Sequence, residues 1–272
     1  MIGMKLHHVR FAYPNGFLAI DDVSMEFAPG EKVAIIGQNG AGKTTLVKMM
    51  NGLLRPTEGD IEIDGQNIAQ KTTAQISKRV GYVFQNPGDQ LFNRTVYDEI
   101  AYTLRHEKVD PAEVDRRVHE AAQLCGLEEE LRTNPYDLPF SLRKFVTIAI
   151  VLANECEFVI LDEPTAGQDA FGMARLAKII DGMHASGKTV LTITHDMDFV
   201  IEHFQRIIVM CDKKKIGDGT KNQIFWDFDL LDRAALKQPV VAALASHLGV
   251  GSDVVSLDDF LEAVEAGTRG IS

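Results

Sequence analysis

The sequence has few cysteines, a single tryptophan and no hydrophobic run long enough to cross a bilayer. Its three cysteines, Cys125, Cys156 and Cys211, lie far apart and form no C-x-x-C pair. Such a set predicts reduced thiols in a cytosolic protein rather than a disulfide framework. The longest strongly apolar run covers residues 145–153, whereas a membrane-spanning helix needs about 20 apolar residues. We therefore expect no membrane span, and the opening MIGMKLHHVR lacks the apolar core of a signal peptide.

Positive charge is also in deficit. The chain has 28 Lys and Arg against 39 Asp and Glu, a formal net charge of −11. This balance argues against a surface that binds nucleic acid or anionic lipid by charge alone. With 272 residues, 45% hydrophobic and 25% charged, the composition is that of a folded protein with one large domain, or one domain and an appendage. If the protein works at a membrane, we expect it to bind a membrane protein.

Short apolar segments alternate with helical patterns along the chain. Residues 32–36, 158–161 and 190–193 are short, apolar and rich in β-branched side chains, which is typical of buried strands. A helical pattern over about 170–186 separates the last two segments, and about 95–155 is mainly helical. This alternation predicts an α/β fold with a parallel sheet covered by helices.

Beyond about residue 220 the sequence predicts two short amphipathic helices. Apolar residues recur at helical spacing in the first: Val240, Val241, Leu244 and Leu248. Ser256 with Asp259 is a capping pattern that opens the second, whose apolar face would hold Leu257, Phe260, Leu261 and Val264. Both faces need a surface to pack on. The main domain and a partner protein are both open as that surface.

A glycine-rich loop is the strongest functional signal. Residues 37–44 (GQNGAGKT) fit G-x-x-x-x-G-K-[ST], after a predicted strand and before a predicted helix. Backbone N–H groups of such a loop cradle phosphates, Lys43 adds a positive charge, and the Thr44 hydroxyl is a ligand for Mg²⁺. The candidate nucleotide-binding residues of this stretch are Gly37, Asn39, Gly40, Ala41, Gly42, Lys43, Thr44 and Thr45.

Two carboxylates follow the predicted strand at 158–161. Asp162 is predicted to hold Mg²⁺, directly or through water, and Glu163 to polarise the attacking water. An apolar strand followed by Asp-Glu is common by itself. Downstream of a phosphate loop it predicts a hydrolytic site.

Together these motifs resemble the nucleotide-binding domain of ATP-binding cassette (ABC) proteins. The resemblance rests on GQNGAGKTT at 37–45, DEPTAG at 162–167 and THD at 194–196. It covers about 1–220 and implies a P-loop NTPase fold with an antiparallel β subdomain and a helical subdomain at about 90–155. Residues 221–272 would form a small helical extension used for dimerisation. ATP and Mg²⁺ are the implied cofactors.

The resemblance implies four further roles. Tyr13 would stack on adenine, and Gln85 would contact Mg²⁺ and the water and signal to a transmembrane partner. Asp169 would lie in the loop that crosses the dimer interface, and His195 would contact the γ-phosphate. Structural alternatives stay open: ordinary packing for Tyr13, and a hydrogen-bonded histidine at a strand end for His195.

A narrower resemblance is to the ATPases of energy-coupling factor (ECF) transporters, which include cobalt and nickel importers. It rests on FQNPGDQLF at 84–92 and on LKQPVV at 236–241 followed by Leu244. In that group the equivalents of Gln90, Leu91 and Phe92 meet a membrane scaffold, and the C-terminal helices join two ATPase subunits. The implied partners are a second ABC ATPase, a membrane scaffold and a small substrate-binding membrane protein, with no nucleic acid. The implied location is peripheral, at the cytoplasmic face of the cell membrane; plain loop packing is the alternative for 90–92.

The sequence departs from the family where L-S-G-G-Q is usual. The matching residues are LPFSL at 138–142. Pro139 has no N–H to donate, and Phe140 blocks close approach of the backbone to a phosphate. Each lost charge-assisted hydrogen bond costs roughly 1.5–3 kcal/mol. Ser141 stays open as a helix cap, or as a hydroxyl donor in a shifted register.

These features predict an asymmetric heterodimer, in which this chain supplies the phosphate loop, Asp162, Glu163 and His195 while a partner supplies an intact signature. The predicted function is the ATP-hydrolysing motor of an ECF-type importer of a vitamin or transition-metal ion. The alternatives are the ATPase of a non-ECF ABC importer and a soluble ABC ATPase acting on nucleic acid or ribosomes. The acidic composition counts against the last, and Glu163 counts against a subunit that only senses ATP.

Overall fold

The computed structural model describes residues 3–251 and 253–269, which form two sheets with helices packed around them. One sheet has four strands in the order β2-β1-β4-β5, and the other has six in the order β10-β9-β3-β8-β7-β6. The strands are β1 (Met4–Ala12), β2 (Leu18–Phe27), β3 (Lys32–Ile36), β4 (Glu58–Ile63), β5 (Gln66–Asn67), β6 (Val80–Val83), β7 (Phe158–Asp162), β8 (Thr189–Ile193), β9 (Arg206–Cys211) and β10 (Lys214–Thr220). The α/β fold predicted from the sequence is confirmed.

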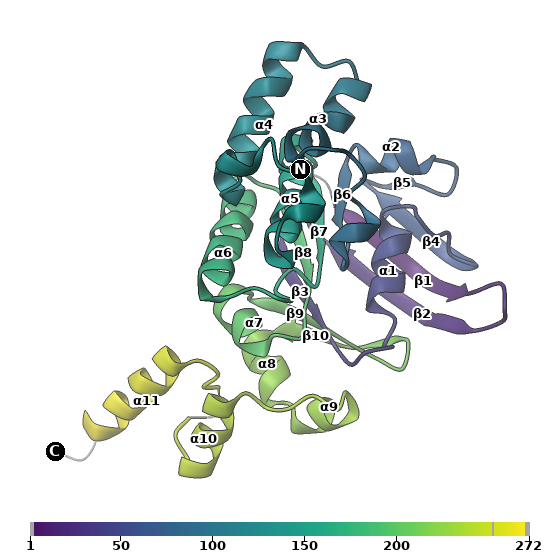
Figure 1. Cartoon of the computed structure of the whole chain (residues 1–272). Helices are drawn as coiled ribbons and strands as arrows, with labels where there is room; N and C mark the ends of the chain where they lie inside the picture. Colours follow the sequence, from purple (N-terminus) through teal and green to yellow (C-terminus); the bar gives the residue numbers. More distant parts are fainter. Residues whose placement is uncertain (1–2, 252, 270–272) are drawn as a thin grey trace.

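Helices cover the large sheet and extend away from it at both ends of the molecule (Figure 1). They are α1 (Lys43–Met50), α2 (Thr73–Ser77), α3 (Val96–His106), α4 (Pro111–Cys125), α5 (Phe140–Ala153), α6 (Ala170–Ala185), α7 (Met197–His203), α8 (Lys221–Trp226), α9 (Phe228–Arg233), α10 (Val240–Leu248) and α11 (Leu257–Arg269). Three short 3₁₀ helices are η1 (Pro87–Asp89), η2 (Glu128–Glu130) and η3 (Pro135–Asp137). Within the described part of the chain, no helix is both long and apolar enough to span a bilayer.

The large sheet brings the functional loops to one edge. Strands β6, β7, β8, β3 and β9 pair in parallel, and only β10 runs antiparallel at its edge. Every residue of β7 and β8 is buried, as in parallel sheets with helices on both faces. Because parallel strands end at the same edge, the segments that follow β3, β7 and β8 lie together. These segments carry the phosphate loop, Glu163 and His195.

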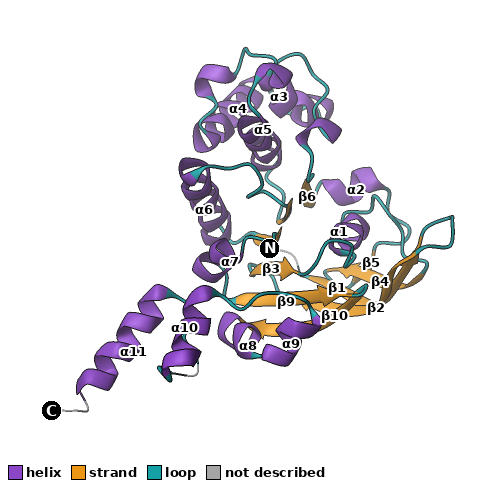
Figure 2. Ribbon diagram, turned by 60° about the horizontal axis from the view of Figure 1, so that its bottom comes forward, coloured by secondary structure: helices purple, strands orange, loops and turns teal. Residues whose placement is uncertain are grey.

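The core has two parts, one on each side of the large sheet. Val33 and Ile35 of β3 belong to one hydrophobic cluster with Leu46 of α1 and with residues of β1 and β2, and α1 lies beside both sheets in Figure 2. The opposite face of β3, at Ala34 and Ile36, packs with α3, α4, α5 and α6. The phosphate loop leaves β3 between these two cores and is held on both sides.

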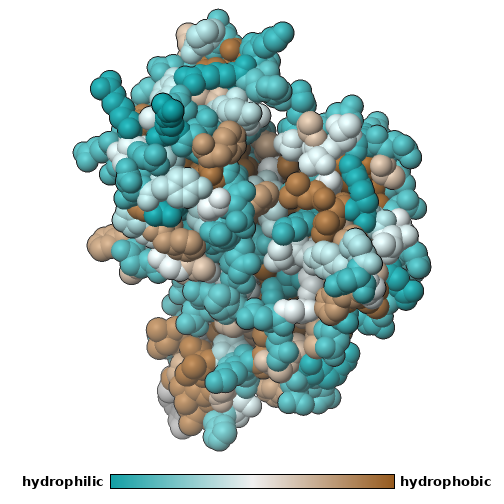
Figure 3. Space-filling model, turned by 45° about the vertical axis from the view of Figure 1, so that its right-hand side comes forward, coloured by the Kyte–Doolittle hydropathy of each residue, from teal (hydrophilic) through white to brown (hydrophobic). Residues whose placement is uncertain are grey.

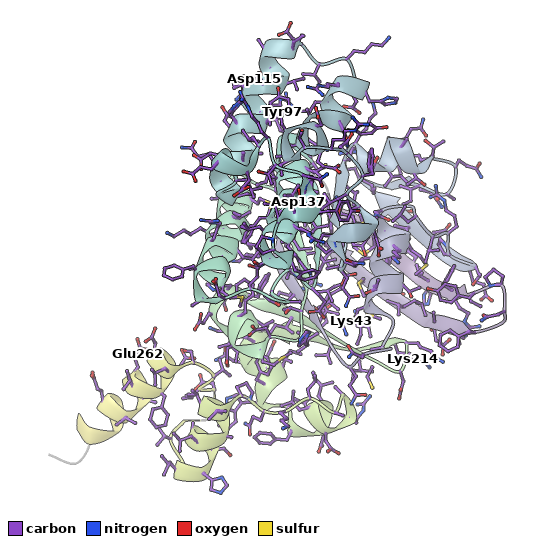
Figure 4. All side chains as sticks on the ribbon, in the orientation of Figure 1. Lys43, Tyr97, Asp115, Asp137, Lys214 and Glu262 are labelled. Atoms are coloured by element: carbon purple, nitrogen blue, oxygen red, sulfur yellow. The ribbon has the colours of Figure 1, made fainter. Side chains whose placement is uncertain are left out.

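Helices α3 and α4 are joined by a polar contact as well as by packing. The Tyr97 hydroxyl donates to Asp115, with 3.0 Å between the two oxygens, and both residues lie in the upper part of the molecule in Figure 4. Lys43 lies far below them, at the centre, where α1 begins. This contact between α3 and α4 therefore lies away from the phosphate loop.

The two predicted C-terminal helices, α10 and α11, form, but they leave apolar side chains exposed. Two short helices that were not predicted, α8 and α9, precede them. Helix α10 buries Ala242 and Ala245, whereas its larger residues Val240, Leu244 and Leu248 are exposed. Helix α11 likewise exposes Leu257 and Leu261. The capping pattern is present, because Ser256 Oγ accepts from the Asp259 N–H and Asp259 Oδ2 from the Ser256 N–H. Figure 3 shows hydrophobic surface gathered at this end of the molecule.

Candidate functional site

The loop between β3 and α1 depends on two glycines. Gly37 and Gly42 have φ angles of 146° and 96°. A Cβ on Gly37 would lie 2.1 Å from the Met210 carbonyl oxygen, and one on Gly42 would lie 2.6 Å from the Ala19 carbonyl oxygen. Helix α1 begins at Lys43, so its first N–H groups have no acceptor within the helix and are available to an anion.

A cavity of about 440 Å³ opens beside this loop, in the size range of small-molecule sites. Nine of the predicted residues line it: Tyr13, Asn39, Gly40, Gly42, Lys43, Thr44, Thr45, Gln85 and Glu163. Three lining residues were not predicted: Phe17, Ala19 and Ile193. Gly37 and Ala41, the other two predicted residues of the loop, are buried and do not line the cavity.

Two aromatic rings stand at one end of the cavity. The ring centroids of Tyr13 and Phe17 are 6.4 Å apart, with 32° between the ring planes. Lys213 Nζ lies 4.9 Å from the Phe17 centroid, and the Tyr13 hydroxyl lies 3.3 Å from Thr45 Oγ1. Tyr13 also packs edge-to-face on Phe11, so the packing alternative holds for one side of the ring. Tyr13 also lines the cavity, so packing does not exclude a contact with a bound ligand.

Asp162 is fully buried at the end of β7. Its Oδ2 accepts from the Tyr82 hydroxyl at 2.9 Å, while its Oδ1 has no hydrogen-bond partner among the described residues. Burial raises the pKa of Asp162, and the hydroxyls of Tyr82 and Thr44 act in the opposite direction. An unsatisfied carboxylate oxygen beside a threonine hydroxyl suits a hard cation such as Mg²⁺. Asp162 and Thr44 therefore fit the predicted metal role, and Gln85 lines the same cavity.

Glu163 lies between the phosphate loop and His195. Its Oε2 is 2.8 Å from His195 Nδ1, and the residue is only 6% exposed. Burial raises the pKa of Glu163, while the neighbouring His195 and Lys43 act to lower it. A carboxylate in this position can accept a proton from water held over the loop.

Lys43 is folded back onto its own loop. Its Nζ donates to the carbonyl oxygens of Gly37 at 2.6 Å and Gln38 at 2.9 Å. Burial lowers the pKa of Lys43, whereas the carboxylates of Glu163 and Asp162 act to raise it. The ammonium group is thus held at the cavity wall.

The phosphate loop, paired carboxylates and adjacent histidine lie together at one edge of the sheet. A family model for ABC transporters matches residues 20–166. The chain belongs to the ABC transporter ATPase family. It is 37% identical over 240 residues to the energy-coupling factor transporter ATP-binding protein EcfA of Methanocaldococcus jannaschii, a match that covers 88% of this chain and 86% of that protein.

Solved structures agree with this assignment. The ATPase matches cbiO1 from Clostridium perfringens, part of the ABC transporter complex cbiONQ, with a TM-score of 0.75 and 32% identity over 89% of this chain and 98% of the other. It also matches the ATP-binding cassette MJ0796, a dimer bound to ADP and Pi, with a TM-score of 0.74 and 25% identity over 80% and 98%. The protein is an ATPase subunit of the ECF type.

The signature position of the ATPase is altered in structure as well as in sequence. Helix α5 begins at Phe140, and Pro139 stands at its cap position without a side-chain hydrogen bond. Of the two alternatives left open for Ser141, helix capping is excluded, because Ser141 lies inside the first turn of α5. Its carbonyl oxygen accepts from Gln168 Nε2 at 3.1 Å. Asp169 instead caps α6 by accepting from the Gly172 N–H at 2.8 Å. None of these residues lines the cavity.

Within the 90–92 segment, Phe92 alone has an exposed side chain. Leu91 is 3% exposed and packs in the core, and Gln90 Oε1 accepts from the Phe84 N–H. Phe92 is 64% exposed and packs edge-to-face on Tyr102, with ring centroids 4.8 Å apart. Of the three residues expected to contact a scaffold, Phe92 remains a candidate. Leu91 follows the alternative of plain loop packing, because its side chain is buried.

Lys144, which no sequence motif indicated, contacts the main chain of Glu163. Lys144 of α5 is fully buried, and its Nζ donates to the Glu163 carbonyl oxygen. Burial lowers the pKa of Lys144 to about 8, although the carboxylates of Asp162 and Glu163 act to raise it. The available signal was a charged residue directly before the apolar run 145–153.

Proposed function

We propose that the ATPase is the motor of an ECF-type importer and works as an asymmetric pair with a second ABC ATPase. One observation carries the proposal. Glu163, held by His195, faces an intact phosphate loop, whereas Pro139 and Phe140 stand where a signature serine and glycine are needed. This chain can therefore build one hydrolytic site but offers a poor signature to its neighbour.

The chain's own residues divide the work of hydrolysis. Lys43 and the N–H groups at the start of α1 bind the phosphates, and the end of the cavity lined by Tyr13 and Phe17 receives the base. Thr44, Asp162 and Gln85 would hold Mg²⁺, which when bound neutralises phosphate charge. Glu163 orients the attacking water and accepts its proton, and His195 keeps the carboxylate in place.

The second ATPase completes this site. Its signature serine and glycine N–H groups would reach the γ-phosphate bound on this chain. The reciprocal contact is weak, because Pro139 lacks an N–H and Phe140 occupies the space of a glycine. A homodimer would hold two damaged sites, so the purified chain alone should hydrolyse ATP slowly. Rapid turnover by a homodimer would contradict the proposal.

The exposed pair Phe92 and Tyr102 is the proposed contact with a membrane scaffold. Glu99 is buried below it and accepts from the N–H groups of Phe92 and Asn93, which fixes the segment. Phe92→Asp should release the ATPase from the scaffold without changing ATP affinity. Leu124→Asp, at an exposed apolar side chain of α4, is the matched control and should leave the complex intact.

The C-terminal helices are the proposed contact with the second ATPase. Leu244, Leu248 and Leu261 are each about half exposed or more, and a partner's C-terminal helices of similar composition would bury them. Leu244→Glu should weaken assembly of the two ATPases. Tm and ATP affinity of the isolated chain should not change, because Leu244 is outside both cores.

The experiment is purification of the ATPase from detergent-solubilised membranes, with the bound proteins identified by mass spectrometry. The proposal predicts a second ABC ATPase with an intact signature, a membrane scaffold and a small membrane protein that binds a vitamin or a transition-metal ion. Such a complex would place the ATPase at the cytoplasmic face of the membrane. Recovery of this chain alone, or as a homodimer, would contradict the proposal.

A further inference from the structure

Glu163 is held by its main chain as well as by its side chain. We propose that Lys144 is a positioning residue, which fixes the peptide of Glu163 and through it the direction of the catalytic carboxylate. The inference rests on the proposed role of Glu163 as the general base. It concerns a buried charge in α5 that nucleotide binding does not require.

The Lys144 ammonium group is buried on the protein side of the site. The residue is 0% exposed, and its Nζ donates to the Glu163 carbonyl oxygen. An ammonium group loses its hydration when it is buried, so the Glu163 carbonyl oxygen replaces water as its acceptor. The Lys144 side chain therefore ties α5 to the turn that follows β7.

The conformation of Glu163 explains why such a tie is needed. Its φ angle is 51°, in the left-handed region that residues with a side chain seldom adopt. Its N–H donates to the Ile193 carbonyl oxygen of β8 at 2.8 Å, and its carbonyl oxygen accepts from Lys144. The backbone is thus held on one side by the sheet and on the other by α5.

The aromatic ring of Phe140 lies beside the Lys144 ammonium group. Lys144 Nζ lies 5.8 Å from the centroid of the Phe140 ring, within the range of a cation–π contact. The ring also packs beside Gly167: a Cβ added to Gly167 would lie 3.1 Å from Cδ1 of Phe140. The residue that replaces a signature glycine therefore covers the ammonium group that holds this chain's own catalytic base. On this proposal, the start of α5 supports the hydrolytic site of its own chain.

The test compares Lys144→Met and Lys144→Gln with the wild type in the assembled transporter complex. Lys144→Met should lower kcat about 10- to 100-fold, a part of the 10²–10⁴-fold that general-base catalysis supplies. KM for ATP and the affinity for a fluorescent ATP analogue should stay within about twofold, because Lys144 does not line the cavity. Lys144→Gln keeps an N–H donor and should recover part of kcat.

Thr147→Val is the matched control. Thr147 is also fully buried in α5, one turn beyond Lys144, and its Oγ1 donates to the Lys144 carbonyl oxygen at 2.7 Å. Its loss measures the cost of removing a buried polar group from this helix without touching Glu163. Thr147→Val should lower Tm while kcat stays near the wild-type value.

Two results would overturn the inference. One is a wild-type kcat in Lys144→Met. The other is a joint change of kcat, KM and Tm that Thr147→Val reproduces. If Lys144→Met does not fold, Lys144→Leu, which also lacks a donor, takes its place, and a wild-type kcat there has the same meaning. Hydrogen exchange in the isolated chain adds a readout without turnover: residues 163–166 should exchange faster in the Lys144 variants than in Thr147→Val.

The double variant Lys144→Met/Glu163→Gln separates this inference from the proposed function. If Lys144 acts through Glu163, the double variant should be no slower than Glu163→Gln alone. If Glu163→Gln retains turnover, the proposed function fails whatever Lys144 does. If Glu163→Gln is inactive and Lys144→Met is fully active, only the inference on Lys144 fails.

Discussion

His195 Nδ1 lies 2.8 Å from Glu163 Oε2, so an exposed imidazole holds a carboxylate that is almost buried. Burial raises the pKa of Glu163, and His195 acts in the opposite direction. The contact therefore keeps the general base ionised to lower pH than its surroundings alone would allow. It also fixes the carboxylate beside the phosphate loop.

Removal of His195 should shift the pH profile of turnover. In His195→Ala the pKa of Glu163 should rise, because the group that lowers it is gone. Glu163 would then be protonated at higher pH, so the acid limb of kcat should move toward alkaline pH. Steady-state ATPase rates of the complex between pH 5.5 and 9 measure this limb. A lower kcat with an unmoved acid limb would show that His195 does not tune Glu163.

The Lys144 pKa of about 8 predicts a pH-dependent stability. The value lies below the ordinary 10.5, so between these two pH values the unfolded chain binds the proton that the native state has lost. The free energy of unfolding contributed by this group should therefore rise with pH in that window, by up to about 1.4 kcal/mol per unit. In urea titrations without nucleotide, the free energy of unfolding of the wild type minus that of Lys144→Met should be larger at pH 9.5 than at pH 7.5. A constant difference between the two proteins would contradict the shift.

Gly37→Ala should destabilise the nucleotide-free protein strongly. The added Cβ meets the Met210 carbonyl oxygen at 2.1 Å, so the loop or β9 must move. Gly65→Ala is the control, because Gly65 also has a positive φ, of 72°, but no atom within 4 Å of the added Cβ. We expect about 1–2 kcal/mol of backbone strain for the control and a larger loss for Gly37→Ala. Equal losses in urea titrations would mean that the close approach to Met210 is unimportant.

The two rings at the cavity mouth should both contribute to nucleotide affinity. Base-aromatic stacking is worth about 1–3 kcal/mol, so Tyr13→Ala should raise the Kd for ATP about tenfold. Phe17→Ala should raise it by less, since Phe17 is 54% exposed and stands at the rim. Fluorescence titration of the isolated chain measures both. Inorganic triphosphate serves as the control ligand, and its affinity should be unchanged in either variant.

The phosphate loop and the carboxylates were predictable because their chemistry needs fixed residue types at fixed spacing. Lys43, Thr44, Asp162 and Glu163 all occupy the positions that the sequence pattern implied. The parallel strands then bring these separate motifs to one edge, a consequence of topology that strand-helix alternation already indicates.

Contacts made by tertiary packing were not predictable in the same way. Phe17 reaches the cavity because the β1–β2 hairpin folds back across the turn after Tyr13. Lys144 reaches Glu163 because tertiary packing brings α5 beside the turn after β7, which no local pattern encodes. Leu91 faces the core and Phe92 faces outward. The two residues follow a short 3₁₀ helix in a segment with no regular hydrophobic periodicity, so the sequence did not indicate which side chain is buried.

The most direct test of the whole account is ATP turnover by the assembled complex with Glu163→Gln in this chain. The account predicts a loss of at least about 100-fold, since general-base catalysis is worth 10²–10⁴-fold, with ATP affinity retained. Turnover within twofold of the wild type would contradict the account and assign hydrolysis to the other site.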